Sequence, residues 1–171
     1  MEYFEVYNQK EQPLNKIVAR GTKLNPGEFF LVVHVWIKNA KNEYLIQQRA
    51  KASDPIPYQW ATTTGLPNVG ESLVDAAIRE TKEEIGVSID TNYLEKLDKI
   101  ITVQSKYRTI THVYLYRKDI DIEVLNLDTS EVKNVKFSPL KDILKMVKNE
   151  QFWNYAKLLD YPDYFKLLES W

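Results

Sequence analysis

The sequence GLPNVGESLVDAAIRETKEEIGV, residues 65–87, decides the fold of this chain. Its first third is rich in Gly, Pro and Asn, the residue types that turns require, and predicts a loop. A helix is expected after Ser72, because Ser72 is a suitable N-cap and Asp75 follows it at the spacing of a shortened capping box. Gly86 is suited to end that helix, since glycine readily adopts the left-handed conformation of a C-terminal cap.

The predicted helix has one apolar face and one acidic face. At 3.6 residues per turn, Glu80, Glu83 and Glu84 become neighbours, and each like-charged pair would cost roughly 0.2–0.5 kcal/mol. A divalent cation would relieve this repulsion, because Mg²⁺ prefers carboxylate oxygens together with water and substrate phosphate. A surface helix that is merely acidic is the alternative. Ala76 and Ala77 continue the acidic face and leave room beside it. The stripe expected to face the core consists of Val74, Ile78, Thr81 and Ile85.

Residues 65–87 resemble the Nudix box, whose pattern is Gly-x5-Glu-x7-Arg-Glu-U-x-Glu-Glu-x-Gly-U, where U is a bulky aliphatic residue. The one departure is Thr81 at an aliphatic position. Threonine is close to valine in size, and its hydroxyl can donate to a backbone carbonyl one turn back. So many fixed positions over this span make the motif highly specific. The positions in register are Gly65, Glu71, Arg79, Glu80, Glu83, Glu84, Gly86 and Val87.

This resemblance covers about residues 29–137 and implies an α/β fold, an α/β/α sandwich with a mixed central sheet and C-terminal helices. It also implies hydrolysis of the pyrophosphate linkage in a nucleoside diphosphate joined to another moiety, with Mg²⁺ or Mn²⁺ as cofactor. Such a cation offsets the charge of the diphosphate, which otherwise repels the attacking water. The metal ligands implied by the resemblance are Glu80, Glu83, Glu84 and the backbone carbonyl of Gly65.

The resemblance implies roles for other residues near the box. Arg79 would be structural, bridging toward Glu71 or Glu83. The general base would be Glu80 or Glu83, and the two alternatives stay open. Glu131 is a further candidate, because some family members place an extra acid just before the last strand, although it could equally be an exposed loop residue.

A second resemblance points to different chemistry. The segment from Phe29 through the box, with Gly-x-Pro-x-x-Gly-Glu-Ser at residues 65–72, is similar to isopentenyl-diphosphate isomerase, an enzyme with the Nudix fold. That isomerase needs a cysteine just before this glycine and a histidine just after it, whereas this chain has Thr64 and Leu66. We therefore place the chain in an isomerase-like branch of Nudix hydrolases and expect no isomerase activity.

A third alternative is a non-catalytic Nudix domain that senses a nucleotide and binds DNA. Such regulators carry a winged-helix extension, for which residues 139–171 are too short. This segment also carries five lysines against five acids, so it shows no charge suited to DNA.

Alternating apolar residues predict the strands. The strongest strand, residues 29–38, is apolar on both faces, as is typical of a central strand that is covered on both sides. The other expected strands are residues 2–7, 17–20, 43–49, 61–64, 99–105, 108–118 and 132–137. The first two would form an N-terminal hairpin within about residues 1–20.

The end of the chain predicts helices, within about residues 139–171. Ser138 is expected as the N-cap, with Pro139 at the first helical position. Apolar residues recur afterwards at helical spacing from Phe152 and again from Tyr164. These faces could pack on the sheet or form a homodimer interface. We expect one Nudix domain spanning residues 1–171.

Composition narrows the function classes. The 171-residue chain has a formal net charge of −1, so it shows no general attraction to nucleic acid or to an acidic membrane. It has no cysteine, which excludes disulfides and thiolate sites and fits a reducing, cytoplasmic location. We see no signal peptide and no apolar run long enough to span a membrane. The expected partner is a small-molecule diphosphate.

A few side chains outside the box are candidates for substrate contact. Tyr58 and Trp60 lie beside a loop that could border the site, where they could stack on a base or simply pack. His34 and His112 lie within predicted strands, where a satisfied core histidine is a better interpretation than a metal ligand.

Overall fold

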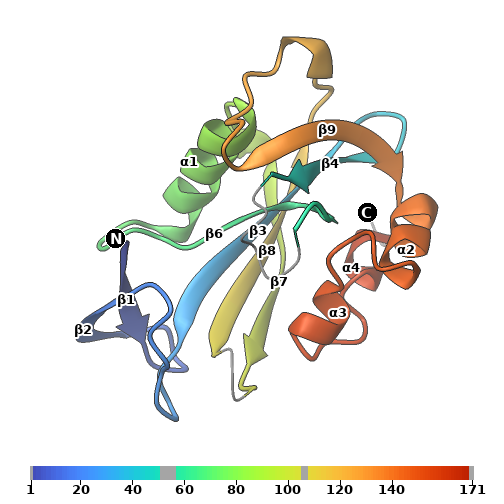
Figure 1. Cartoon of the computed structure of the whole chain (residues 1–171). Helices are drawn as coiled ribbons and strands as arrows, with labels where there is room; N and C mark the ends of the chain where they lie inside the picture. The colour runs from blue at the N-terminus through green and yellow to red at the C-terminus, as the bar shows by residue number, and fades with distance from the viewer. Residues whose placement is uncertain (1, 51–56, 105–107, 170–171) are drawn as a thin grey trace.

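The computed structural model describes residues 2–50, 57–104 and 108–169, and these residues form a layered α/β fold (Figure 1). The strands are β1 Tyr3–Tyr7, β2 Pro13–Ala19, β3 Phe30–Lys38, β4 Glu43–Arg49, β5 Trp60–Ala61, β6 Thr63–Gly65, β7 Leu94–Thr102, β8 Thr109–Arg117 and β9 Val132–Pro139. The helices are α1 Leu73–Ile85, α2 Leu140–Lys148, α3 Tyr155–Leu158 and α4 Lys166–Glu169, with short 3₁₀ turns η1 Thr91–Tyr93 and η2 Ile122–Val124.

The central sheet is mixed. Its order is β5-β4-β3-β8-β7, with β6 also paired to β3 and β9 to β4. β3 and β8 run parallel along their whole length, and the other pairs in this sheet are antiparallel. α1 covers one face, and α2, α3 and α4 lie on the other (Figure 1). The expected α/β/α sandwich with a mixed sheet is therefore confirmed.

Strand β3 separates two cores. Val33 and Val35 point to the α1 side, where they pack against Ala76 and Ala77. Trp36 points to the other side, into a cluster of aromatic residues from the C-terminal segment. This arrangement follows from strand geometry, in which successive side chains alternate between the two faces, and it makes β3 the central strand that the sequence predicted.

Helix α1 is turned differently about its axis from the expected orientation. Thr81 and Ile85 are buried as expected, but Val74 is 37% exposed and belongs to the solvent side. Ala76 and Ala77 are fully buried instead. Their small side chains allow α1 to approach β3 closely, so the face that also carries two of the glutamates is turned toward the sheet.

The caps of α1 are those that the sequence predicted. Ser72 Oγ accepts a hydrogen bond from the backbone N–H of Asp75 at 3.1 Å, and Gly86 ends the helix in the left-handed conformation with φ of 76°. Thr81 Oγ1 donates to the carbonyl of Ala77 at 2.7 Å, which explains how a polar residue is accommodated on the buried face.

The C-terminal segment corrects two expectations. Pro139 is itself the N-cap of α2, and Ser138 lies one residue earlier in β9, where it is buried. The helical spacings after Phe152 and Tyr164 produce only the short helices α3 and α4. Their aromatic side chains fill the core on one face of the sheet, so these residues close the domain.

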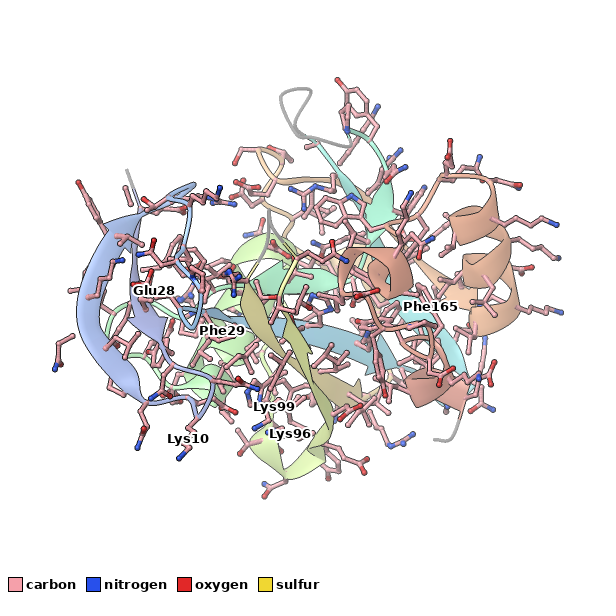
Figure 2. All side chains as sticks on the ribbon, turned by 90° about the horizontal axis from the view of Figure 1, so that it is seen from below. Lys10, Glu28, Phe29, Lys96, Lys99 and Phe165 are labelled. Atoms are coloured by element: carbon pink, nitrogen blue, oxygen red, sulfur yellow. The ribbon has the colours of Figure 1, made fainter. Side chains whose placement is uncertain are left out.

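The N-terminal hairpin, β1 and β2, is a separate two-stranded sheet anchored to the main one. β2 begins at Pro13, earlier than the expected strand at residues 17–20, because only a tight turn at residues 8–12 separates the two strands. Tyr7 and Phe29 exchange two backbone hydrogen bonds of 2.9 and 2.8 Å. A second contact anchors the tip of the hairpin to the main sheet. Lys99 of β7 donates to Glu11 at 2.7 Å, close to the hairpin tip marked by Lys10 (Figure 2).

Two further boundaries differ from the sequence expectation. β7 begins at Leu94 rather than at residue 99, since it pairs with β8 along a longer stretch. Residue 105, the expected end of that strand, lies outside the described residues. Within the described part of the chain, no helix is both long and apolar enough to cross a membrane.

Candidate active site

The site is built where β6 ends and α1 runs back past it. Gly65 is the last residue of β6, and the side chain of Glu80 lies directly against its backbone. A Cβ atom added to Gly65 would fall 2.2 Å from both Cγ and Cδ of Glu80. Glycine is therefore required here by close approach, because any larger residue would displace the carboxylate from this position.

Arg79 ties the acidic residues of the loop and the helix together. It makes a bidentate pair with Glu71, with Nε–Oε1 at 2.8 Å and Nη2–Oε2 at 2.9 Å. Nη1 donates to Glu80 at 2.9 Å and to Glu83 at 3.0 Å. Nη2 also donates to the carbonyl of Leu66 at 3.0 Å, which fixes the loop after Gly65. The hydrogen bonds from Arg79 hold the pKa of Glu71 below its usual value.

Glu84 is the most deeply buried carboxylate of the set. Gln47 of β4 donates to it at 2.6 Å, and Gln47 is itself held by the hydroxyl of Thr63 at 3.1 Å. Burial raises the pKa of Glu84 to about 8, although the hydrogen bond from Gln47 acts in the opposite direction. Burial also raises the pKa of Glu80, against the effect of Arg79 beside it. The protein does not fully offset the cost of ionising these carboxylates, so a bound cation would stabilise their charged forms.

These side chains line a pocket of about 290 Å³. Its acidic wall comes from α1. Asp128 and Glu131 join the lining from the loop before β9, and Arg49 and Trp153 also line the pocket. The Arg49 guanidinium carbon lies 4.7 Å from the centre of the Trp153 ring, so a cation stacked on an aromatic ring borders the carboxylates. The carboxylates lining this pocket are Glu2, Glu80, Glu83, Glu84, Asp128 and Glu131.

The loop that carries Glu131 is fastened to the end of α1. The backbone N–H of Asp128 donates to the carbonyl of Glu84 at 3.0 Å, and the N–H of Glu131 donates to the carbonyl of Asp128 at 2.9 Å. The carbonyl of Glu131 accepts from Ala50 at 2.9 Å. Glu131 therefore belongs to the pocket rather than to a remote surface loop.

The donor set suits a divalent cation that keeps part of its water shell. The acidic side chains at the pocket offer carboxylate oxygens, the donor atoms that Mg²⁺ and Mn²⁺ prefer. Glu80 and Glu84 lie one helical turn apart at the same pocket, and Gly65 leaves room for the first of them. Among the described residues, no three acidic or histidine side chains already converge on one point. Because Mg²⁺ is usually held by one or two carboxylates with water and substrate phosphate, this set fits the ion.

Some candidates from the sequence lie elsewhere. Tyr58 and Trp60 line a separate hollow of about 390 Å³, near Lys133 and Lys136, whose ammonium groups lie over the two rings. The structure does not bring them to the acidic pocket. The aromatic residue that does line the pocket is Trp153, from the C-terminal segment, together with Phe4 of the hairpin.

Sequence reasoning also missed Gln47 and Arg49. Both are polar residues at the end of a strand whose other side chains are largely apolar, and this interruption of the pattern is a signal that could have indicated a site. Phe4 and Trp153 gave no comparable signal, because only the tertiary fold brings them beside the box.

The two histidines are not part of the pocket. His34 is buried, and its Nδ1 lies 2.7 Å from the hydroxyl of Tyr164. His112 is buried with Nε2 3.0 Å from Glu11 of the hairpin turn. The interpretation as a satisfied core histidine is consistent with the contact of His34. His112 is buried, but neither of its ring nitrogens makes a well-formed hydrogen bond with the described residues.

Comparison with known proteins agrees with this geometry. The family model described as the NUDIX domain matches residues 28–160. An uncharacterized Nudix hydrolase of Listeria innocua is 35% identical over 158 residues, covering 91% of this chain and 90% of that protein. An isopentenyl-diphosphate Delta-isomerase of Pectobacterium atrosepticum is 27% identical over 151 residues, covering 84% of this chain and 83% of the isomerase.

A solved structure shows the same fold. The crystal structure of a Deinococcus radiodurans protein superposes with a TM-score of 0.74 and 18% sequence identity, covering 93% of this chain and 98% of the other. At this identity the likeness concerns the fold alone.

Proposed function

The chain belongs to the Nudix family, and from this premise we propose that it hydrolyses the pyrophosphate linkage of a nucleoside-diphosphate-X type substrate with Mg²⁺ or Mn²⁺. One observation carries the proposal. Glu80 and Glu84 are held at the floor of a pocket, although burial makes their ionised forms costly. A core without a ligand would replace such carboxylates with apolar side chains at little cost.

We propose Glu80, Glu83 and Glu84, with the backbone carbonyl of Gly65, as the residues that would hold the cation. A bound divalent cation would supply positive charge that offsets the diphosphate and polarises the phosphoryl oxygen. Arg79 keeps two of these carboxylates oriented, and its bidentate pair with Glu71 fixes its own position. The protein's contribution is therefore to keep the acidic wall assembled before substrate arrives.

A general base is needed to take a proton from the attacking water, and three glutamates are available. Glu80 and Glu83 lie on the acidic wall, where both accept from the same nitrogen of Arg79. Glu131 lines the same pocket from the loop before β9. Two candidates for the base therefore come from α1, and the third comes from that loop. Single Gln variants with a kcat–pH profile for each would separate these alternatives.

The isomerase alternative is less well supported. Thr64 and Leu66 line the pocket on either side of Gly65, and neither offers the thiol or imidazole that the resemblance to the isomerase requires. The non-catalytic alternative, a nucleotide-sensing Nudix domain, would tolerate loss of the acidic wall. Here Glu80, Glu83 and Glu84 all line one pocket, which favours catalysis.

The test is hydrolysis of a broad panel in the presence of Mg²⁺ or Mn²⁺, followed by chromatography of the products. The panel comprises nucleotide sugars, dinucleoside polyphosphates, coenzyme A, NADH, ADP-ribose, oxidised nucleoside triphosphates and isopentenyl diphosphate. Glu84→Gln is compared with Glu123→Gln, which makes the same change at an exposed glutamate of η2.

Metal-dependent cleavage that Glu84→Gln abolishes and Glu123→Gln preserves would establish the hydrolase. If nothing on the panel is cleaved, and a nucleotide binds equally to wild type and Glu84→Gln, the sensing domain becomes the better explanation. Isomerisation of isopentenyl diphosphate would instead support the second alternative.

A further inference from the structure

A second cavity, of about 630 Å³, adjoins the acidic pocket. The two share four lining residues, which are Phe4, Arg20, Val32 and Leu66. We propose that this cavity holds the non-reacting organic group of the substrate, and that this group combines an apolar body with a negative charge of its own. The inference rests on the proposed hydrolase function and deepens it, since it concerns which diphosphates are accepted.

The walls of the cavity are apolar. Phe4 and Phe30 meet edge to face, with ring centroids 6.1 Å apart and an interplanar angle of 74°. Leu24 is buried at the cavity, and Val32 and Leu66 complete the apolar lining. The volume lies within the range of about 300–1,000 Å³ that is usual for pockets that bury a small molecule. An organic group of nucleoside size would therefore fit and would gain apolar contact.

The rim of the cavity is cationic. Arg20, Lys23 and Arg108 line it, and none of the described residues that line it is acidic. Arg20 is paired with Glu2 and also lines the acidic pocket. Lys23 and Arg108 are the cationic residues that line this cavity and not the acidic pocket. The acidic pocket next to it has the opposite character. No described carboxylate pairs with Lys23 or Arg108, and such positive charge attracts an anion, so the group bound here should carry a charge that the diphosphate does not supply.

Arg79 contacts residues that line both cavities. The same guanidinium that orients Glu80 donates to the carbonyl of Leu66, the residue between the cavities. A substrate with its organic group against Leu66 would present its diphosphate to the α1 wall. Contacts with this remote group would then hold the whole substrate at the site without entering the reaction itself.

The cavity exists before any ligand binds. Its outer side is made by the end of the hairpin and the loop of residues 20–24, and Glu28 holds this region by accepting from Lys16 at 2.8 Å and from the N–H of Asn25 at 2.9 Å. Figure 2 shows Glu28 and Phe29 at the junction of the hairpin with the sheet. A preformed cavity requires little ordering on binding, which favours a specific role.

The first arm of the test uses two fluorescent probes that do not depend on hydrolysis. One is 1-anilinonaphthalene-8-sulfonate, an apolar anion, and the other is N-phenyl-1-naphthylamine, its uncharged analogue. We expect one equivalent of the anionic probe to bind and Lys23→Glu to weaken it roughly tenfold, with little effect on the neutral probe. Lys41→Glu is the matched control, because it reverses the charge of an exposed lysine in the turn at the far end of β3.

The second arm links the cavity to catalysis. For any substrate that the panel identifies, the anionic probe should inhibit competitively, and Lys23→Glu should raise KM with kcat unchanged. Pairs that differ by one phosphate, NADPH against NADH and coenzyme A against its dephospho form, should favour the member with the extra phosphate. Lys23→Glu should reduce the preference for the extra phosphate, whereas Lys41→Glu should leave that preference unchanged.

The outcomes separate the two proposals. No hydrolysis of any compound would reject the proposed function. Hydrolysis that the probe does not inhibit competitively would reject the cavity as a substrate site. Absence of probe binding, or equal weakening by Lys23→Glu and Lys41→Glu, would reject the apolar-anion character of the cavity.

Discussion

The two faces of strand β3 both bury polar groups, but in opposite ways. On the aromatic side, His34 lies against the hydroxyl of Tyr164 at 2.7 Å, and Trp36 Nε1 donates to that hydroxyl at 3.0 Å. On the α1 side, the carboxylates of Glu80 and Glu84 are partly buried at a pocket, where burial raises the pKa of each. The first set is satisfied within the protein, whereas the second, when ionised, carries a charge that the protein only partly compensates.

This difference distinguishes a structural polar group from a functional one. The hydroxyl of Tyr164 accepts one hydrogen bond and can donate another, so the His34 ring stays neutral at no cost in unpaired groups. The glutamate side invites an external cation instead. We therefore expect changes on the α1 side to alter activity much more than stability, and changes on the aromatic side to do the reverse.

The largest effect is expected for Glu84→Gln. This change removes a proposed metal ligand, so kcat/KM should fall by more than the roughly 10–100-fold that loss of a supporting residue around a metal costs. In metal-free buffer at pH 8 or above, the free energy of unfolding should stay the same or rise, because an uncompensated buried charge is removed. Urea unfolding and initial rates test this. If Glu84→Gln keeps its activity but clearly loses stability, the α1 side serves stability rather than activity, contrary to our assignment.

Gly65→Ala should also damage the α1 side, through geometry alone. The new Cβ would meet the end of the Glu80 side chain, which can swing aside, so we expect a loss of stability of at most about 1 kcal/mol but a marked loss of activity. The double variant Gly65→Ala/Glu80→Ala removes the collision, and a double-mutant cycle should show recovered stability with activity still absent. If the single variant is as stable and active as wild type, the close contact between these residues does not matter.

Much of this side of the molecule was predictable from sequence. The caps at Ser72 and Gly86, the central strand and the register of the acidic positions all depend on neighbours within one turn or on strand alternation. Sequence periodicity alone did not give the rotation of α1 about its axis. The rotation of α1 depends on how closely the helix can approach the sheet. The small side chains of Ala76 and Ala77 face the sheet and are buried, whereas Val74 is turned toward solvent.

The rest of the site was not predictable for a tertiary reason. Trp153 and Phe4 reach the pocket from opposite ends of the chain, and no local pattern records that meeting. The sequence suggests Tyr58 and Trp60 because they lie beside a loop that could border the site, but the fold places them at a separate hollow. The short helices α3 and α4 likewise follow from aromatic packing, which overrides the helical spacing of their residues.

On the aromatic side, Tyr164→Phe should lower stability without lowering activity. It removes the hydroxyl that partners both His34 and Trp36, so buried polar atoms on each would lose their partner, at a cost of roughly 1–3 kcal/mol. Chemical denaturation measures the loss. Tyr93→Phe, which removes the hydroxyl of an exposed tyrosine, is the control. A substantial fall in kcat at a temperature where the variant is fully folded would show that the two faces are not independent.

The smallest effect concerns acid stability and tests whether His34 is kept neutral. Burial lowers the pKa of His34 to about 3, whereas in the unfolded chain it is near 6.5. Between these values the unfolded state binds more protons, so folding stability falls as the pH drops below about 6.5. The loss should reach about 1.4 kcal/mol at pH 5.5.

His34→Gln keeps an acceptor for Tyr164 but cannot titrate. Its destabilisation relative to wild type should therefore shrink by about 1.4 kcal/mol between pH 7.5 and pH 5.5, as measured by urea unfolding. All other titrating groups contribute equally to both proteins and cancel in this difference. A constant difference across the pH range would mean that His34 takes up a proton in the folded protein, and that the aromatic side also holds a charge.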